Sequence, residues 1–227
     1  MALLARLFVQ TVLWLGFMAV LLFVAAGNWR WIQGWAFIAI FAGGSAVFGA
    51  WLYRRDPALL AARMGPLVQR AQPLWDQIFM SAAMIGWNAW LIAMAIDAQR
   101  WHWSQVPAWL EVVGGLLIAG GFAAVMPVFA ANSFAAPVVR VQDERGQRVI
   151  DSGPYALVRH PMYAAAMLYL IGLPLLLGSW FGLIGTVLIA LGIAWRAVRE
   201  ERTLRRELTG YGDYMARVRW RLVPYVW

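Results

Sequence analysis

The sequence contains no cysteine and no lysine, only two histidines, and few charged residues of either sign. The absence of cysteine excludes disulfide bonds, thiolate metal sites and a cysteine nucleophile. Two histidines without a paired motif give no basis for a metal centre, so we expect none. Charged residues make up 13% of the chain and hydrophobic residues 63%, whereas soluble domains average about 25% charged and about 45–50% apolar. This composition excludes a water-soluble enzyme and a disordered chain, and it predicts a membrane protein.

Long charge-free stretches indicate where the chain crosses the membrane. A crossing needs roughly 20 apolar residues, so each of four stretches supplies one helix. These stretches are Leu7–Trp29, Trp31–Tyr53, Gln77–Ile96 and Val112–Val139. A fifth stretch from Met162 to Trp195 is too long for one crossing, and Gly178-Ser179 near its middle offers a turn to a tight hairpin of two short helices. The predicted fold class is an all-α, multi-pass membrane helical bundle with six spans and a cytoplasmic tail helix.

The positions of the arginines predict the orientation of this bundle. All 19 basic residues are arginines, and with six crossings all but Arg30 and Arg100 fall on one side of the membrane. Cytoplasmic loops carry an excess of basic residues, so both termini are predicted to be cytoplasmic, with a bacterial inner membrane as the favoured location. The same rule explains the net charge of +8 without nucleic acid as a partner.

The tripeptide Arg159-His160-Pro161 comes immediately before the fifth predicted helix. Proline favours the first position of a helix and restricts the residue before it, so Pro161 is expected to open the helix with His160 at its cap. The free N–H groups of such a helix end attract an anion, and Arg159 adds a fixed charge. The alternative is that the two basic side chains only anchor the chain at the lipid headgroups.

A second polar cluster follows the last predicted span. Arg196 and Glu200 are four residues apart, so on a helix they share a face and could pair, with Glu201 beside them. An ordinary interfacial salt bridge is the alternative. A charge at the end of a span is costly and often functional, and both clusters lie on the same side of one hairpin, so they can meet.

Small and amide-bearing residues in the fourth stretch allow further predictions. Gly114-Gly115 and Gly120-Gly121 indicate close helix packing. Asn132 and Ser133 are either interhelical hydrogen-bond partners or site residues.

Three pieces of sequence carry a family resemblance when they are taken together and in order. They are SGPYALVRHPMYAAAMLYLIG, then EERTLRREL, then YGDYMARVRWRLVP. In this combination the chain resembles the isoprenylcysteine carboxyl methyltransferase family, within the wider group of phospholipid and isoprenylcysteine membrane methyltransferases. Leu208-Thr209 replaces the usual Phe-Gly pair and Ala164 replaces a frequent glycine, so the resemblance is to a divergent member.

The resemblance implies an enzyme that binds S-adenosylmethionine from the cytosol and methylates an amphiphilic or lipid-anchored acceptor from the bilayer. Matched motif by motif, the cofactor-binding residues that it implies are Arg140, Gln147, Arg148, Val149, Ile150, Tyr155, His160, Pro161, Met162, Tyr163 and Glu200. The charge arguments above add Arg159 and Glu201 to this set. The methionine carboxylate suits the helix start at His160, and the cationic sulfonium suits tyrosine rings and Glu200.

Arg196 and Glu200 are the predicted catalytic residues, with Arg196 at the position where the family places an arginine that meets the substrate. Carboxyl O-methylation is favoured, and positioning then replaces a general base and can supply about 7–11 kcal/mol. For an amine acceptor, Glu200 or Glu201 would stabilise the cation that forms. In this interpretation residues 1–132 form an N-terminal four-span region that shapes the substrate entrance, and residues 133–227 form the methyltransferase core.

Two other functions compete with this interpretation. Membrane sterol reductases end in a similar RHPxY-plus-tyrosine arrangement and use NADPH, but their tails usually carry cysteine and lysine, and this chain has neither. A non-enzymatic scaffold or small transporter would predict charges inside the spans, and the predicted spans have none.

Overall fold

The computed structural model describes residues 2–69 and 72–227, and the described residues contain helices and no strands. Arg70, one of the arginines assigned above to the cytoplasmic side, lies outside them. The long helices are α1 (Ala2–Ala26), α2 (Ile32–Arg55), α4 (Leu74–Ile96), α5 (Ala108–Ala131), α6 (Pro161–Leu177) and α7 (Trp180–Glu207). The short ones are α3 (Pro57–Arg63) and α8 (Tyr211–Arg217), with a π-helical turn over Asp97–Trp101 and two 3₁₀-helical turns over Asp143–Arg145 and Gly153–Ala156.

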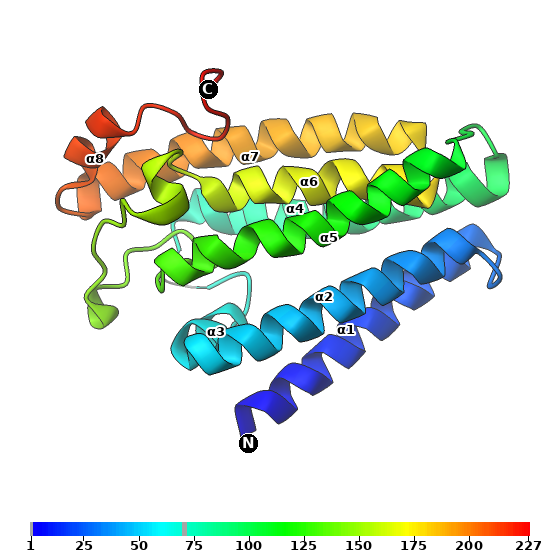
Figure 1. The fold of residues 1–227 in the computed structure, drawn as a ribbon, viewed down its shortest axis with the longest axis horizontal. Helices are drawn as coiled ribbons and strands as arrows, with labels where there is room; N and C mark the ends of the chain where they lie inside the picture. The colour runs from blue at the N-terminus through cyan, green and yellow to red at the C-terminus, as the bar shows by residue number, and fades with distance from the viewer. Residues whose placement is uncertain (1, 70–71) are drawn as a thin grey trace.

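The helices run back and forth along one direction, as Figure 1 shows. The turns between α1 and α2, α4 and α5, and α6 and α7 lie at one end, and both termini lie towards the other. Helices α1, α2, α4, α5 and α7 are long and apolar enough to cross a membrane, and α6 is a shorter apolar helix of 17 residues. The chain is therefore a multi-pass helical membrane protein, and the predicted fold class is confirmed.

The predicted hairpin turn lies at Gly178-Ser179. Gly178 adopts a left-handed φ of 78°, which glycine tolerates best, and its N–H donates to the carbonyl of Leu175. Ser179 caps α7 by accepting a hydrogen bond from the N–H of Gly182 at 3.0 Å. The prediction of two short helices was wrong for the second one, because α7 runs 28 residues into the charged tail. The alanine, arginine, leucine and glutamate residues of that tail are good helix formers.

The fourth predicted span was too long at its C-terminal end. Helix α5 ends at Ala131, and Asn132 takes an extended conformation while its Oδ1 accepts from the N–H of Phe134 at 2.8 Å. Asparagine favours turns, so Asn132 ends the helix although no charge is present. The loop over residues 132–160 that follows carries most of the predicted site.

Helices α5 and α6 pack closely because glycines face each other. A Cβ atom on Gly172 would lie 2.6 Å from the carbonyl oxygen of Gly114 and 2.9 Å from Cβ of Leu117. A Cβ on Gly120, in contrast, would meet nothing within 4 Å. The prediction of close packing is confirmed for Gly114 and wrong for Gly120.

We expect Gly172→Ala to lower the free energy of unfolding by about 1–3 kcal/mol, because the added methyl group pushes two backbones apart. Thermal unfolding in detergent, followed by circular dichroism, measures this change. Gly120→Ala is the matched control, and it should be neutral or slightly stabilising. Equal unfolding temperatures for the two variants would contradict the close contact.

Candidate active site

Helix α6 begins as the sequence predicted, with Pro161 at its first position and His160 at its N-cap. The His160 side chain makes no cap hydrogen bond. Its ring instead stacks on Tyr163, with ring centroids 5.4 Å apart and an interplanar angle of 11°, and its Nε2 lies 3.2 Å from Oε1 of Glu201. The prediction that the start of α6 and the acidic part of the last long helix lie close together is thus confirmed.

Glu201 contacts three basic side chains near the start of α6. It accepts hydrogen bonds from Nε of Arg159 at 2.6 Å and from Nε of Arg221 at 2.9 Å, besides its contact with His160. The backbone N–H groups of Arg159 and His160 also donate to the carbonyls of Trp220 and Arg221. Glu201 is 3% exposed, so it ties the C-terminal tail to the start of α6 from inside the protein.

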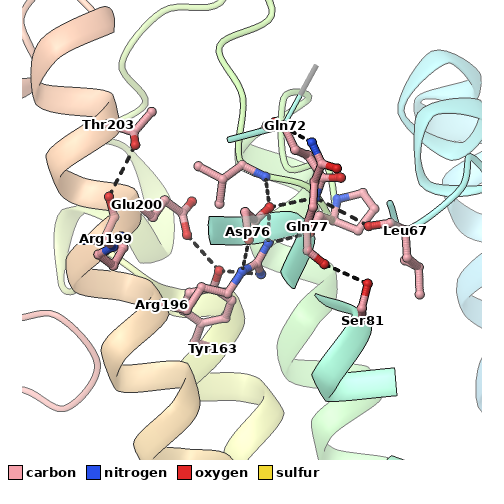
Figure 2. A network of polar contacts seen from close by, with 12 residues as sticks. Leu67, Gln72, Asp76, Gln77, Ser81, Tyr163, Arg196, Arg199, Glu200 and Thr203 are labelled. Atoms are coloured by element: carbon pink, nitrogen blue, oxygen red, sulfur yellow. Dashed lines mark hydrogen bonds and ion pairs between the residues drawn. The ribbon is translucent and has the colours of Figure 1, made fainter. Parts of the chain in front are cut away.

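Arg196 and Glu200 share a face of α7 but do not pair directly. The Tyr163 hydroxyl links them, because it accepts from Nη1 of Arg196 at 2.9 Å and donates to Oε2 of Glu200 at 2.7 Å (Figure 2). Arg199, directly before Glu200 in the chain, lies instead over the rings of Trp75 and Trp195. The predicted direct pair is therefore replaced by a bridge through Tyr163.

The residue that holds Arg196 in place is Asp76, which no sequence motif indicated. Asp76, at the start of α4, accepts from Nε of Arg196 at 2.8 Å and from the N–H of Val139 at 3.0 Å, and it is 0% exposed (Figure 2). Its further donors are Nη2 of Arg196 at 3.4 Å and Nε2 of Gln72 at 2.7 Å. The available signal was an acidic residue at the start of an apolar span, where a charge needs a buried partner.

A cavity lies between the loop over residues 132–163 and the C-terminal half of α7. It holds about 800 Å³, counting the part open to solvent. Its walls include these predicted residues: Arg140, Gln147, Arg148, Val149, Ile150, Tyr155, Arg159, His160, Pro161, Met162, Tyr163 and Glu200. Two predicted residues, Arg196 and Glu201, do not line it. Both lie behind the wall, where they hold Tyr163, Arg159 and His160.

Residues outside the predicted set complete the cavity wall. Asn132 lines it and donates from Nδ2 to the Tyr155 hydroxyl at 2.9 Å, so its side chain bonds to the loop and not to a neighbouring membrane helix. Tyr211 and Tyr214 of α8 line it as well, and the Tyr214 hydroxyl donates to the carbonyl of Tyr155. Burial raises the pKa of Tyr155 to about 12, which keeps its hydroxyl protonated at neutral pH. Tyr155 therefore contributes an uncharged aromatic wall to the cavity.

The charges that remain at the cavity suit a zwitterionic ligand. Glu200 is the acidic residue among those lining it, and Arg140 supplies a cationic wall. Arg140 pairs with Glu144 at 2.8 Å through Nη2, and its buried Nε has no hydrogen-bond partner among the described residues. A buried donor without a partner is costly, and a ligand carboxylate would satisfy it. The carboxylate of S-adenosylmethionine fits this donor, and its sulfonium fits the tyrosine rings and Glu200.

Fold and site together define a multi-pass membrane protein with a polar cofactor cavity at one end of its helices. Comparison with protein families then identifies the enzyme class: residues 109–210 match the phospholipid methyltransferase family. No curated protein matches the chain. The matched segment runs from α5 to the start of α8 and contains every predicted site residue.

The family match gives the activity in general terms. The enzyme is an S-adenosylmethionine-dependent methyltransferase, and its acceptor belongs to the lipids. This finding favours the methyltransferase interpretation over the NADPH-dependent reductase and the non-enzymatic alternative. Asp76, Tyr211 and Tyr214 lie outside the matched segment. Tyr211 and Tyr214 belong to the third motif of the sequence resemblance, whereas Asp76 belongs to none of its motifs.

Proposed function

We propose that this protein transfers a methyl group from S-adenosylmethionine to the carboxylate of a lipid-like acceptor at the cytoplasmic leaflet. The observation that carries the choice of a carboxylate is the state of Glu200. It is the acidic group on the cavity wall, and its Oε2 already accepts the Tyr163 hydroxyl. An amine acceptor must shed a proton, which requires a base, whereas an ionised carboxylate attacks as it stands.

S-adenosylmethionine supplies an electrophilic methyl group, and transfer forms an O–CH₃ bond to the acceptor while the donor leaves as neutral S-adenosylhomocysteine. The residues of the chain bind and position rather than exchange protons. Glu200 lies where it can stabilise the sulfonium charge, and Arg140 where it can bind the methionine carboxylate. Tyr155, Tyr211 and Tyr214 cover the cavity with rings that exclude water, which strengthens these electrostatic contacts.

Arg196 has a positioning role in this proposal. Its guanidinium is held by Asp76, by the carbonyl of Pro137 at 2.8 Å and by the Tyr163 hydroxyl. It therefore fixes the bridge to Glu200 and the extended segment at Pro137 in one arrangement. The contact with the acceptor that the family resemblance implies for Arg196 stays a prediction.

The orientation belongs to the same proposal. The loop over residues 132–160, the C-terminal end of α7 and α8, which line the cavity, lie at the end of the helices away from the turns between α1 and α2, α4 and α5, and α6 and α7 (Figure 1). Arg30 and Arg100 belong to the turns at the opposite end. The excess of basic residues supports a cytoplasmic location for the end with the cavity. A cytosolic cofactor and a membrane-embedded acceptor would then meet at the inner leaflet.

Transfer to lipid tests the proposed reaction directly. The protein in lipid nanodiscs is incubated with S-adenosylmethionine labelled in its methyl group and with a bacterial lipid extract. We expect label in the organic phase that mild alkali releases as methanol, because carboxyl methyl esters hydrolyse and methylated amines do not. Alkali-stable label would move the acceptor to an amine, and an unlabelled lipid phase would contradict the proposal. Nanodiscs without protein are the control.

A further inference from the structure

A second cavity lies beside the first, among the membrane helices. It holds about 890 Å³, counting the open space at its mouth, and its walls come from α1, α2, α3, α4, α5 and α6. The lining is largely aromatic and aliphatic, and it comprises Trp14, Met18, Phe41, Arg63, Trp87, Gly121, Phe122, Val125, Phe129, Met162, Ala165, Ala166 and Tyr169. Trp14 on its wall is 43% exposed, so the cavity is reached from the lipid side.

The two cavities meet at Met162, which lines both of them. Helix α6 supplies the shared wall, because Met162, Ala165, Ala166 and Tyr169 follow the i, i+3, i+4, i+7 spacing of one helical face. The two alanines leave room between the larger residues at either end. An elongated apolar chain lying along this face would therefore reach the first cavity with one end. This first cavity, which is proposed above to hold S-adenosylmethionine, is called the donor cavity below.

Arg63 of α3 is the charged residue on this apolar lining. Its Nη1 donates to the carbonyl of Ala135 at 2.8 Å and lies 3.9 Å from Sδ of Met162, and its guanidinium lies 4.4 Å from the centre of the Phe129 ring. It thus sits at the junction of the two cavities, since Ala135 lines the donor cavity. Nε and Nη2 make no hydrogen bond within the described residues, and this is the edge that binds a carboxylate through two parallel bonds.

Burial supports an anionic partner for this side chain. It lowers the pKa of Arg63 to about 10, because an apolar environment disfavours the charged form, although the group stays protonated at neutral pH. A bound anion would stabilise the charged guanidinium of Arg63 and offset the free-energy cost of its burial. Positive charge also argues against a cationic acceptor at the same place.

Tyr169 presents a second polar group deeper in the cavity. Its hydroxyl is buried and has no hydrogen-bond partner among the described residues. The ring itself is held by stacking on Trp87, with centroids 5.8 Å apart, and by the edges of Phe37 and Phe41. A buried hydroxyl without a partner costs free energy, which a polar atom on the ligand would recover.

We propose that this second cavity holds the apolar chain of the methyl acceptor, that the Nε–Nη2 edge of Arg63 binds its carboxylate, and that Tyr169 donates a hydrogen bond to a polar atom farther along the chain. Met162 and Tyr169 are two helical turns apart, which places that atom roughly 10 Å from the reacting end. This inference rests on the proposed carboxyl methylation. It assigns acceptor recognition partly to α1, α2, α3 and α4, which lie outside the family match, and partly to α5 and α6, which lie within it.

Photolabelling tests the site with a defined probe. The probe is a palmitic acid that carries a diazirine near the middle of its chain, compared with the amine of the same chain and label position. The full-length protein in detergent is irradiated with each probe, and the labelled peptides are identified by mass spectrometry. We expect the acid to label peptides that contain Met162–Tyr169 and Trp14–Met18, and the amine to label them about tenfold less.

Two variants test the charge of Arg63 and the free volume of the cavity separately. Arg63→Gln should reduce labelling by the acid about tenfold or more, and Ala166→Phe should reduce it by filling the cavity while it keeps the charge. The matched control is Arg54→Gln, which removes an exposed arginine at the same end of the bundle and should label like the wild type. Unchanged labelling in Arg63→Gln, or labelling confined to outward faces of the helices, would overturn the proposal.

The role of Tyr169 has its own readout. Stearate and a hydroxystearate with its hydroxyl near mid-chain compete for the photoprobe in wild type and in Tyr169→Phe. The hydroxystearate should compete better in the wild type, and Tyr169→Phe should remove that advantage. Equal competition in both proteins would refute the hydrogen bond. Titration of each variant with S-adenosylmethionine shows whether the donor cavity is intact, so failure of donor binding is distinguished from failure of the acceptor site.

Discussion

Removing either partner of the buried pair between Asp76 and Arg196 should destabilise the protein by about 3–5 kcal/mol. Each single change leaves the other charge in a site that excludes water, where an uncompensated ion is costly. Asp76 is 0% exposed and Arg196 is 6% exposed, so solvent cannot replace the lost partner. Chemical unfolding of Asp76→Leu and of Arg196→Met in detergent measures the two effects.

The double variant Asp76→Leu/Arg196→Met separates stability from function. A buried ion pair replaced as a unit by apolar side chains is often no less stable than the original, so the double variant should recover most of the lost stability. Methyl transfer should stay at least about tenfold below wild type, because Tyr163 has lost a donor and the N–H of Val139 its acceptor. Recovery of full activity with stability would contradict the positioning role of Arg196.

The second large effect concerns the sulfonium charge. We expect Glu200→Gln to weaken the binding of S-adenosylmethionine by about ten- to a hundredfold, because the variant keeps an oxygen for the Tyr163 hydroxyl but loses the negative charge. S-adenosylhomocysteine has a neutral sulfur, so its affinity should change little. Calorimetric titration with both ligands measures the difference.

Glu207→Gln is the control for this titration. Glu207 is an exposed residue of the same helix and does not line the cavity, so its neutralisation should leave both affinities near wild type. If Glu200→Gln lowered the affinity for both ligands equally, Glu200 would shape the cavity without interacting with the sulfonium charge, which would contradict the prediction.

The sequence predicted what depends on local rules. Absence of charge located the helices, Gly178-Ser179 located the hairpin turn, and Pro161 located the start of α6. The motif resemblance identified about half of the residues that line the donor cavity, because those residues lie on one hairpin and its two flanking segments. The hairpin brings these segments together by itself, so their proximity does not depend on how distant helices pack.

The sequence could not predict what depends on how distant helices pack. Asp76 meets Arg196 across 120 positions of the chain, and only the packing of α4 against α7 brings them together. The same limit explains Glu201, which was predicted as a cofactor contact beside Glu200 but does not line the cavity and contacts Arg159 and Arg221 instead. The prediction placed the end of this helix too late because residues 132–139 carry no charge. A helix can end within such a charge-free segment, and here it ends at Ala131.

The central claim is that the cavity between residues 132–163 and the end of α7 holds the methyl donor. Ultraviolet crosslinking of labelled S-adenosylmethionine to the purified protein, followed by peptide mapping, tests it most directly. We predict label on peptides from Asn132 to Tyr163 and from Glu200 to Tyr214, lost in the presence of excess S-adenosylhomocysteine but not of NADPH. Label that falls at the opposite end of the helices, near Asp97 and Ser179, or that NADPH displaces equally, would contradict the account.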